Sequence, residues 1–438
     1  MTDPAPTYTP YRWFVALTLV VTSAAMQTTM IGFAPLMGVI AKDLHIGLAY
    51  ATGAFMGGFT LVSALSALAG GSICDRFGVP RAYLLGSVLL IAPTLLLPYA
   101  GDSFGAVLAV RLLQALGVGP ILSGVSPVAA TWFPARERPL ATGLQGTAVC
   151  LGIALGLVGA PALYQMLGDW RQAMVWLSLF PGLGLALTIV LNLGPTPSVA
   201  CSVPGGGDVV LCGGPHAYRQ ACRQSALWMA VLIDVFLAWV YTAFNDLTPT
   251  YLAVEPPVGV GYGPLVAGKL MMVFQVGAMV GSLAVGVIAS RLFREPTRPP
   301  IVVGFGLFAL FATAIKFPVV YGNPALLMTS LCLAGFFMAW VVPSVLAFIA
   351  LHYPVGITGK VVGTMFAVGT FGGVPAIFAG ALALHRTGNY QLSIVIVAVA
   401  ALCGIVPALF LKPPRKTSPA EENASAARAM KPAVSSEL

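Results

Sequence analysis

Long apolar stretches follow one another along almost the whole chain, and they constrain the fold more than any other feature. Each is long enough to cross a hydrocarbon core of about 30 Å as a helix. Of the 438 residues, 58% are hydrophobic and 8% are charged, and the stretches lack the polar stripes of soluble helices. The sequence therefore predicts an all-α polytopic membrane protein with twelve transmembrane helices, at 12–36, 48–74, 81–99, 104–131, 140–166, 171–194, 226–253, 263–290, 299–317, 323–350, 360–384 and 390–411.

These helices divide into two sets of six. A six-helix bundle over 12–194 and a second over 226–411 are separated by a Gly- and Pro-rich linker, 195–225. We expect 1–11 to be a short tail and the small, polar residues 412–438 to be a disordered tail. The three linker cysteines have spacings that match no metal template.

The distribution of Lys and Arg predicts the orientation in the membrane. With an even number of spans both termini share a side, and that side carries sixteen basic residues against four on the other. The excess places both termini and the linker in the cytoplasm. Because the basic residues report orientation, the net charge of +8 gives no reason to expect a nucleic-acid partner.

The two halves resemble each other in sequence. A shift of 220 residues brings Pro134 onto Pro354 and Gly152 onto Gly372, and a shift of 215 brings Arg76 onto Arg291. Agreement over several helices indicates duplication of a six-helix unit. Parallel repeats of this kind are typical of transporters that rock two bundles about a site at the membrane midplane.

Two motifs identify the family that the chain resembles. Between the second and third spans, GGSICDRFGVPRA contains the pattern G-x-x-x-D-R-x-G-x-x-R, formed by Gly71, Asp75, Arg76, Gly78 and Arg81. RLLQALGVG lies in the fourth span. With twelve spans as six plus six, these motifs resemble the major facilitator superfamily, whose members are secondary transporters. WFPARERPLATG resembles members that carry nitrate, organic anions or monocarboxylates more than sugar or drug carriers.

The resemblance implies that the first motif gates the cytoplasmic mouth. Asp75 would pair with a neighbouring helix end in one state, Arg76 and Arg81 would anchor at the interface, and Gly71 and Gly78 would allow a tight turn. A plain cationic anchor explains the two arginines equally well, but it does not explain Asp75 with its glycines.

Four ionisable residues lie within predicted spans: Arg111, Asp234, Asp246 and Lys269. Such charges are costly in a membrane, so they line a cavity or find a partner. Asp246 and Lys269 lie at similar depth in neighbouring spans, so they could form an ion pair. Lys269 could instead anchor an anionic substrate or snorkel to the outer interface. The resemblance implies a coupling or substrate role for Arg111, with a structural hydrogen-bond hub as the alternative, and both acids are candidate proton carriers.

Further polar residues are candidates for lining the cavity. Gln27 lies in the first span, Tyr241 and Asn245 in the seventh, and Gln275 in the eighth. Aligning the prolines of the first and seventh spans puts Tyr241 near the position of Gln27, and members of the resembled family commonly line the cavity with these two spans.

Together these features predict a secondary transporter in a bacterial-type inner membrane. We expect a monomer that meets membrane lipids and moves a small anion, such as a monocarboxylate or an inorganic oxyanion, with proton coupling. No phosphate-binding loop, catalytic dyad, cofactor site or metal site is evident. The alternatives are a proton-driven cation, drug or metal-ion transporter, or a membrane sensor that does not transport.

Overall fold

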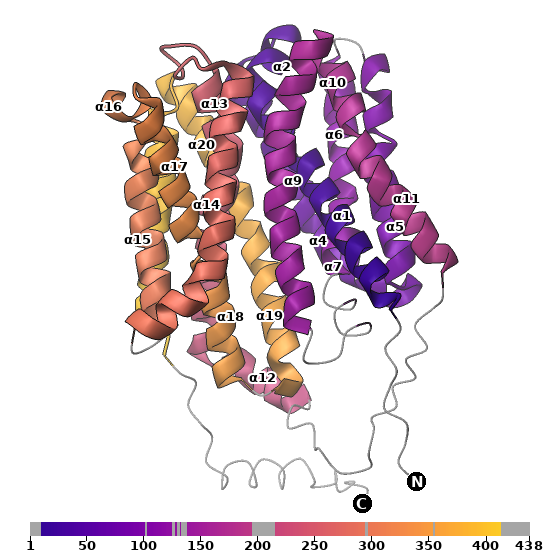
Figure 1. Cartoon of the computed structure of the whole chain (residues 1–438), viewed down its shortest axis with the longest axis vertical. Coiled ribbons are helices and arrows are strands. Elements are labelled where there is room, and N and C mark those ends of the chain that lie inside the picture. The colour runs from indigo at the N-terminus through magenta and orange to yellow at the C-terminus, as the bar shows by residue number, and fades with distance from the viewer. Residues whose placement is uncertain are drawn as a thin grey trace, which may run out of the picture.

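The computed structural model describes residues 10–100, 103–124, 128, 132, 138–194, 215–293, 297–353 and 355–412. Every regular element in these ranges is helical, as predicted. Eleven helical stretches are long and apolar enough to cross a membrane, and α15, Arg298–Ala314, is an apolar helix of 17 residues within the spanning range. The helices run side by side along the long axis in Figure 1.

The first half contains six spans, several of them interrupted. Its elements are α1 (Arg12–Ile31), η1 (Ala34–Leu36), α2 (Met37–Asp43), α3 (Leu48–Thr52), η2 (Gly53–Gly57), α4 (Gly58–Phe77), α5 (Val79–Ile91), η3 (Thr94–Tyr99), α6 (Phe104–Leu116), α7 (Val118–Ser123), α9 (Arg138–Leu167), α10 (Trp170–Leu177) and α11 (Leu179–Leu193). The first span runs on to Asp43, beyond its predicted end at 36. Pro35 lies in the first turn of a new short helix, where a missing N–H is tolerated.

The second half contains the remaining spans. Its elements are α12 (Pro215–Arg223), α13 (Ser225–Ala253), α14 (Gly263–Leu292), α15, α16 (Pro318–Tyr321), α17 (Pro324–Met338), α18 (Val341–His352), α19 (Val355–Gly369), η4 (Thr370–Gly372), α20 (Gly373–Thr387) and α21 (Gln391–Phe410). The seventh and eighth spans, α13 and α14, are each a single unbroken helix.

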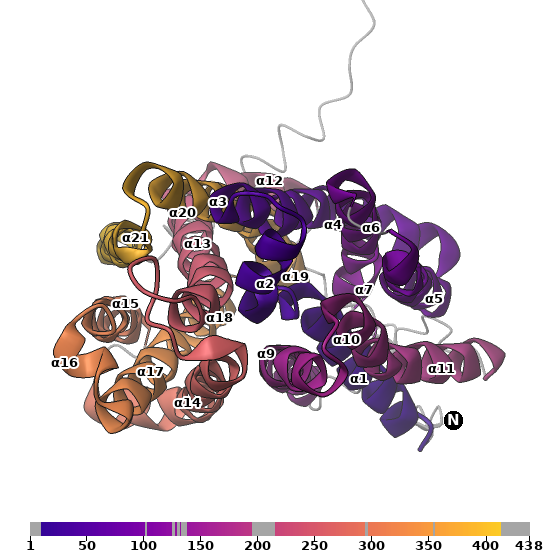
Figure 2. The same cartoon turned by 90° about the horizontal axis from the view of Figure 1, so that it is seen from above.

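The two halves lie beside each other, with the first half indigo to magenta and the second pink to yellow in Figures 1 and 2. We call the end that carries α2, α10 and α16 the α2 end, and the opposite end, which carries α12, the α12 end. Close contacts between the halves are found toward the α2 end. Thr250 Oγ1 donates to Ala34 O over 2.7 Å, and a Cβ on Gly38 would lie 2.9 Å from Val254.

The motif after the second span forms a turn of one residue. Helix α4 runs on to Phe77, and Gly78, with a φ of 81°, joins it to α5. A left-handed φ of this kind favours glycine. Arg76 and Arg81 are exposed. Gly71 and Asp75 lie on α4, but the side chain of Asp75 is outside the described residues, so the gating role of this motif stays a prediction.

The last part of the predicted linker is a helix. In α12, Ala221 is buried, and the Tyr218 hydroxyl lies 2.6 Å from Thr364 Oγ1 of α19. Residues 195–214 are outside the described residues. The linker therefore ends in a helix that packs on the second half.

Candidate functional site

A small pocket with several polar side chains in its lining lies between the two halves, near the middle of the first and seventh spans. Eight residues line it: Gln27, Met30 and Ile31 of α1, Ile153 of α9, and Tyr241, Thr242, Asn245 and Asp246 of α13. Its cavity volume of about 20 Å³ is close to that of one water site and far below the roughly 300 Å³ of small-molecule pockets. Tyr241 and Thr242 are followed four positions later by Asn245 and Asp246, so the four share one face of an unbroken helix.

A chain of amide hydrogen bonds stiffens one wall of this pocket. Asn245 Nδ2 donates to Tyr241 O over 2.9 Å, and Gln275 Nε2 of α14 donates to Asn245 Oδ1 over 2.5 Å. The oxygen of Gln275, Oε1, is buried and accepts no hydrogen bond from the described residues. One acceptor beside the pocket therefore remains available to a water or a ligand.

Asp246 is the charged residue among those that line the pocket. Its side chain is 2% exposed, and no hydrogen bond or salt bridge joins it to another described residue. Pro249, one turn further along α13, supplies no N–H to the Asn245 carbonyl, so the backbone here is also short of a donor. A buried carboxylate in these surroundings favours a proton or a cation.

Arg111 lies outside the pocket and acts as the structural hub of the first half. Its guanidinium is 0% exposed, and each of its donors has an acceptor. Nη1 donates to Thr29 O over 2.8 Å and to Gln114 Oε1 over 3.2 Å, Nε donates to Phe55 O over 3.3 Å, and Nη2 contacts Met30 O and Met56 Sδ. The rings of Phe33 and Phe59 cover it, with centroids 4.4 and 3.9 Å from Cζ.

Two interruptions in the backbone explain this environment. Helix α1 ends at Ile31, so the carbonyls of Thr29 and Met30 have no backbone donors from a following turn. The π-helical turn η2 interrupts the second span and brings the Phe55 carbonyl toward Arg111. This geometry fits the alternative of a structural hydrogen-bond hub, and a substrate or coupling role for Arg111 stays a prediction.

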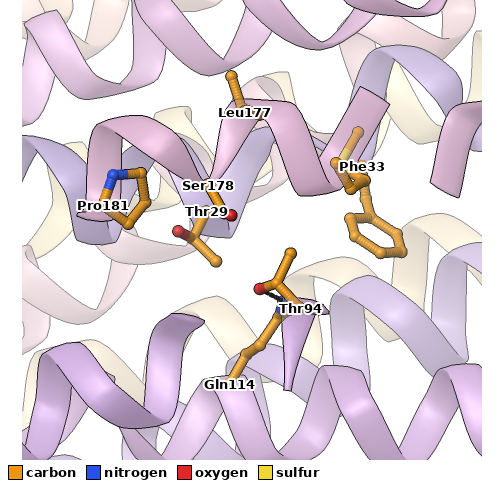
Figure 3. Close-up of a pocket in the computed structure, with 8 residues that line it drawn as sticks. Thr29, Phe33, Thr94, Gln114, Leu177, Ser178 and Pro181 are labelled. Carbon is orange, nitrogen blue, oxygen red and sulfur yellow. Dashed lines mark hydrogen bonds between the residues drawn. The ribbon is translucent and has the colours of Figure 1, made fainter. Parts of the chain in front are cut away.

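A second pocket lies within the first half, beside the Arg111 hub. Thr29, Phe33, Thr94, Gln114 and four residues of α10 and α11 or their junction line it (Figure 3). Gln114 Nε2 donates to Thr94 Oγ1 over 2.6 Å, and Thr94 Oγ1 donates to Leu90 O. Because these polar groups satisfy one another, we assign this pocket no ligand.

Lys269 does not pair with Asp246 in this structure, one of the arrangements that the sequence left open. No salt bridge joins the two among the described residues, and Lys269 is exposed on the same face of α14 as Met272, Val276 and Leu283. Lys269 precedes Gln275 by six residues, which turns its side chain about 120° away from the pocket wall. Because Gln275 meets Asn245, Lys269 also lies six residues, about 9 Å, along α14 from the level of the pocket wall.

Asp234 lies apart from both pockets. Twelve residues separate it from Asp246 on α13, about 18 Å along the axis. It is 6% exposed, its carboxylate packs against Gly369 of α19, and it makes no hydrogen bond with another described residue. A side chain at position 369 would collide with this carboxylate.

The structure thus brings together five of the predicted polar residues: Gln27, Tyr241, Asn245 and Asp246 in the pocket, and Gln275 behind it. Sequence reasoning missed Thr242, which its spacing of four residues from Asp246 could have revealed. It also missed the apolar lining residues Met30, Ile31 and Ile153, which carry no distinguishing signal. Within the described ranges, no three His, Cys, Asp or Glu residues come together as a metal site would require.

Comparison with known proteins identifies the family. A family model described as Major Facilitator Superfamily matches residues 17–376, with a second match over 259–437. The chain is 23% identical over 377 residues to a probable sulfoacetate transporter of Cupriavidus necator, covering 82% of this chain and 84% of the relative. It is 24% identical over 379 residues to a cis,cis-muconate transport protein of Acinetobacter baylyi, with the same coverage of 82% and 84%.

A solved structure shares the fold. The D-xylose–proton symporter superposes with a TM-score of 0.70 and 15% identity, over 92% of this chain and 97% of the symporter. The family match spans most of the chain, and the helices place a small pocket between two halves, the arrangement found in transporters built of two repeated bundles. The protein is a transporter rather than an enzyme, and the chain belongs to the Major Facilitator Superfamily.

Proposed function

We propose that the protein is a proton-coupled symporter of a small organic anion, with Asp246 as the site of proton coupling. One observation carries the proposal. The pocket between the halves is lined by a single charged side chain, an acid, which is buried and without an ion-pair partner among the described residues. An anion that enters beside an ionised Asp246 is repelled, whereas a protonated Asp246 accepts it. Binding of the anion and of the proton are then coupled.

Arg111 supplies the positive charge that this proposal needs. It lies behind the backbone of α1, where it bonds the carbonyl of Met30, a pocket-lining residue, and it interacts electrostatically with Asp246. When Asp246 is protonated, the field of Arg111 is no longer balanced, and it favours an anion in the pocket. In this role Arg111 acts at a distance, and the substrate itself meets Gln27, Tyr241 and Asn245.

The relatives support the class of substrate. Sulfoacetate and cis,cis-muconate are both small anions with acidic groups at each end, and the proteins named for them share about a quarter of their residues with this chain. Amide and hydroxyl groups at Gln27, Asn245 and Tyr241 can donate hydrogen bonds to carboxylate or sulfonate oxygens.

Location and assembly are part of the same proposal. The excess of Lys and Arg on one side favours an inner membrane with both termini in the cytoplasm. A monomer suffices, because all eight residues of the pocket come from one chain. Asp234 is retained as a second candidate proton site, since its carboxylate is buried and makes no hydrogen bond or ion pair with the described residues.

A second candidate function is exchange of a cation for protons. The observation that favours it is the same acid, because the residues that line the pocket include Asp246 and no base. Thermal-shift binding with cis,cis-muconate, sulfoacetate, D-xylose and tetraphenylphosphonium separates the two functions. The proposal expects stabilisation by one or both anions; stabilisation by the cation alone would replace it with the second candidate.

Proteoliposome transport of the anion that binds tests the coupling. With an inward proton gradient we expect the wild type to accumulate the anion, whereas Asp246→Asn should lose accumulation by roughly tenfold or more and keep exchange of anion for anion. Asp169→Asn is the matched control, because an asparagine still caps α10 at a site outside the pocket. Accumulation by Asp246→Asn at the rate of this control would rule out Asp246 as the coupling site.

A further inference from the structure

The π-helical turn η2 lies where the two halves meet near the α2 end. It begins and ends with glycine, as GAFMG, and separates α3 from α4 in the second span. π-Helical turns are rare and occur frequently at functional sites. In this one, a group from outside the turn bonds one of its carbonyls. Here that group comes from the fourth span.

Arg111 holds η2 from inside the first half. Its Nε donates to Phe55 O over 3.3 Å, its Nη2 contacts Met56 Sδ at 4.0 Å, and Phe59, just after the turn, stacks on it with a centroid 3.9 Å from Cζ. Phe55 itself is 0% exposed. The turn is thus fixed from its buried side, and its glycines are left facing the other half.

Phe378 of α20, in the second half, rests on those glycines. A Cβ on Gly57 would lie 3.0 Å from two atoms of the Phe378 ring, and one on Gly53 would lie 4.0 Å from the ring and 3.7 Å from Ala381. Any side chain at Gly57 would push against the ring. The ring is 42% exposed, so it covers the turn from the edge of the boundary between the halves and can withdraw without leaving a large cavity.

We infer that η2 and Phe378 form a gate between the halves near the α2 end, and that Arg111 is a positioning residue for this gate. The guanidinium fixes the shape of the turn, the two glycines leave a hollow on its outer face, and the ring fills the hollow while the halves are closed there. Opening of this end separates α20 from η2, and Arg111 keeps the turn formed so that the ring can return. The inference rests on transport by the protein but not on the charge of its substrate or on protons.

Hydrogen–deuterium exchange on the full-length protein in nanodiscs tests the gate. In Phe378→Ala we expect roughly tenfold faster exchange, confined to peptides covering Leu48–Gly58 and Gly373–Thr387, with an unchanged melting temperature. Phe366→Ala is the control, because Phe366 lies on the same span with 41% exposure and is not among the contacts of Gly53 or Gly57. Unchanged exchange in those two peptides, or an equal change in Phe366→Ala, would overturn the gate.

Arg111→Lys tests the positioning role. A lysine keeps the charge but has no planar fork, so it cannot bond Phe55 O and the α1 carbonyls together. We expect faster exchange in Leu48–Gly58, as in Phe378→Ala. If exchange rises only around Thr29 and Met30, Arg111 braces the first span alone and the inference is wrong. If Arg111→Lys does not fold, Gly57→Ala takes its place: its added methyl displaces Phe378, and unchanged exchange over Gly373–Thr387 would contradict the gate.

Discussion

The first two spans and their counterparts, the seventh and eighth, place polar groups inside the membrane in different ways. In the first half the helices break, at η1 and at η2, and a buried cation receives the carbonyls that the breaks expose. In the second half α13 and α14 run unbroken, Leu331 stands in the repeat position of Arg111, and polarity comes from side chains such as Asn245, Asp246 and Gln275. The first half therefore supplies a buried positive charge and half of the pocket lining, and the second half supplies four of the five polar side chains that line the pocket.

Removing the buried cation should have the largest effect on this contrast. Arg111→Leu copies the residue of the second half and leaves the carbonyls of Thr29, Met30 and Phe55 buried without donors. At about 1–3 kcal/mol each, their desolvation should prevent stable folding, seen as loss of the monodisperse peak in size-exclusion chromatography. Leu331→Met, a substitution of similar volume in the second half, is the control and should change little. If Arg111→Leu gives a monodisperse peak as large as that of Leu331→Met, the first half does not depend on its buried cation for folding.

One buried glutamine in each half tests whether the second half contacts the solute while the first half serves the structure. Gln275 holds Asn245 beside the pocket, whereas Gln114 accepts from Arg111 and donates to Thr94 within the first half. Gln275→Leu should raise the KM for transport about tenfold, because the loss of this bond of about 1.4 kcal/mol frees the pocket wall. Gln114→Leu should lower the melting temperature and leave KM within about twofold. Uptake and thermal unfolding measure the two effects. If Gln114→Leu raised KM and Gln275→Leu lowered only the melting temperature, the comparison would be wrong.

Lys269→Gln should have the smallest effect. The side chain lies on the exposed face of α14, turned away from Asp246, so neither KM nor the maximal rate of uptake should change by more than about twofold. Lys269→Met, matched to its neighbours Met271 and Met272, controls for loss of polarity. A tenfold rise in KM in both variants would restore Lys269 as an anchor for the anion.

The number and order of the spans could be predicted because hydropathy alone determines them. The pocket residues of α13 could also be predicted, since Tyr241, Asn245 and Asp246 share a face in any regular helix. The surroundings of Lys269 could not be predicted. Sequence position indicates depth in the membrane, but the rotation of each helix against its neighbours is set by packing. The surroundings of Arg111 could not be predicted either, because they depend on carbonyls exposed by η1 and η2. A sequence such as GAFMG does not by itself predict a π-helical turn.

The contact of α12 with α19 has a consequence for how the protein is made. Tyr218 and Thr364 are 146 residues apart in the chain, so the helix that opens the second half is synthesised long before the surface that receives it. At about 5–20 residues per second, the delay is roughly 7–30 s. During that interval four further spans must be inserted while Tyr218 lacks its partner on α19. The order of synthesis therefore makes α12 one of the last elements of the second half to settle, although it is the first to leave the ribosome.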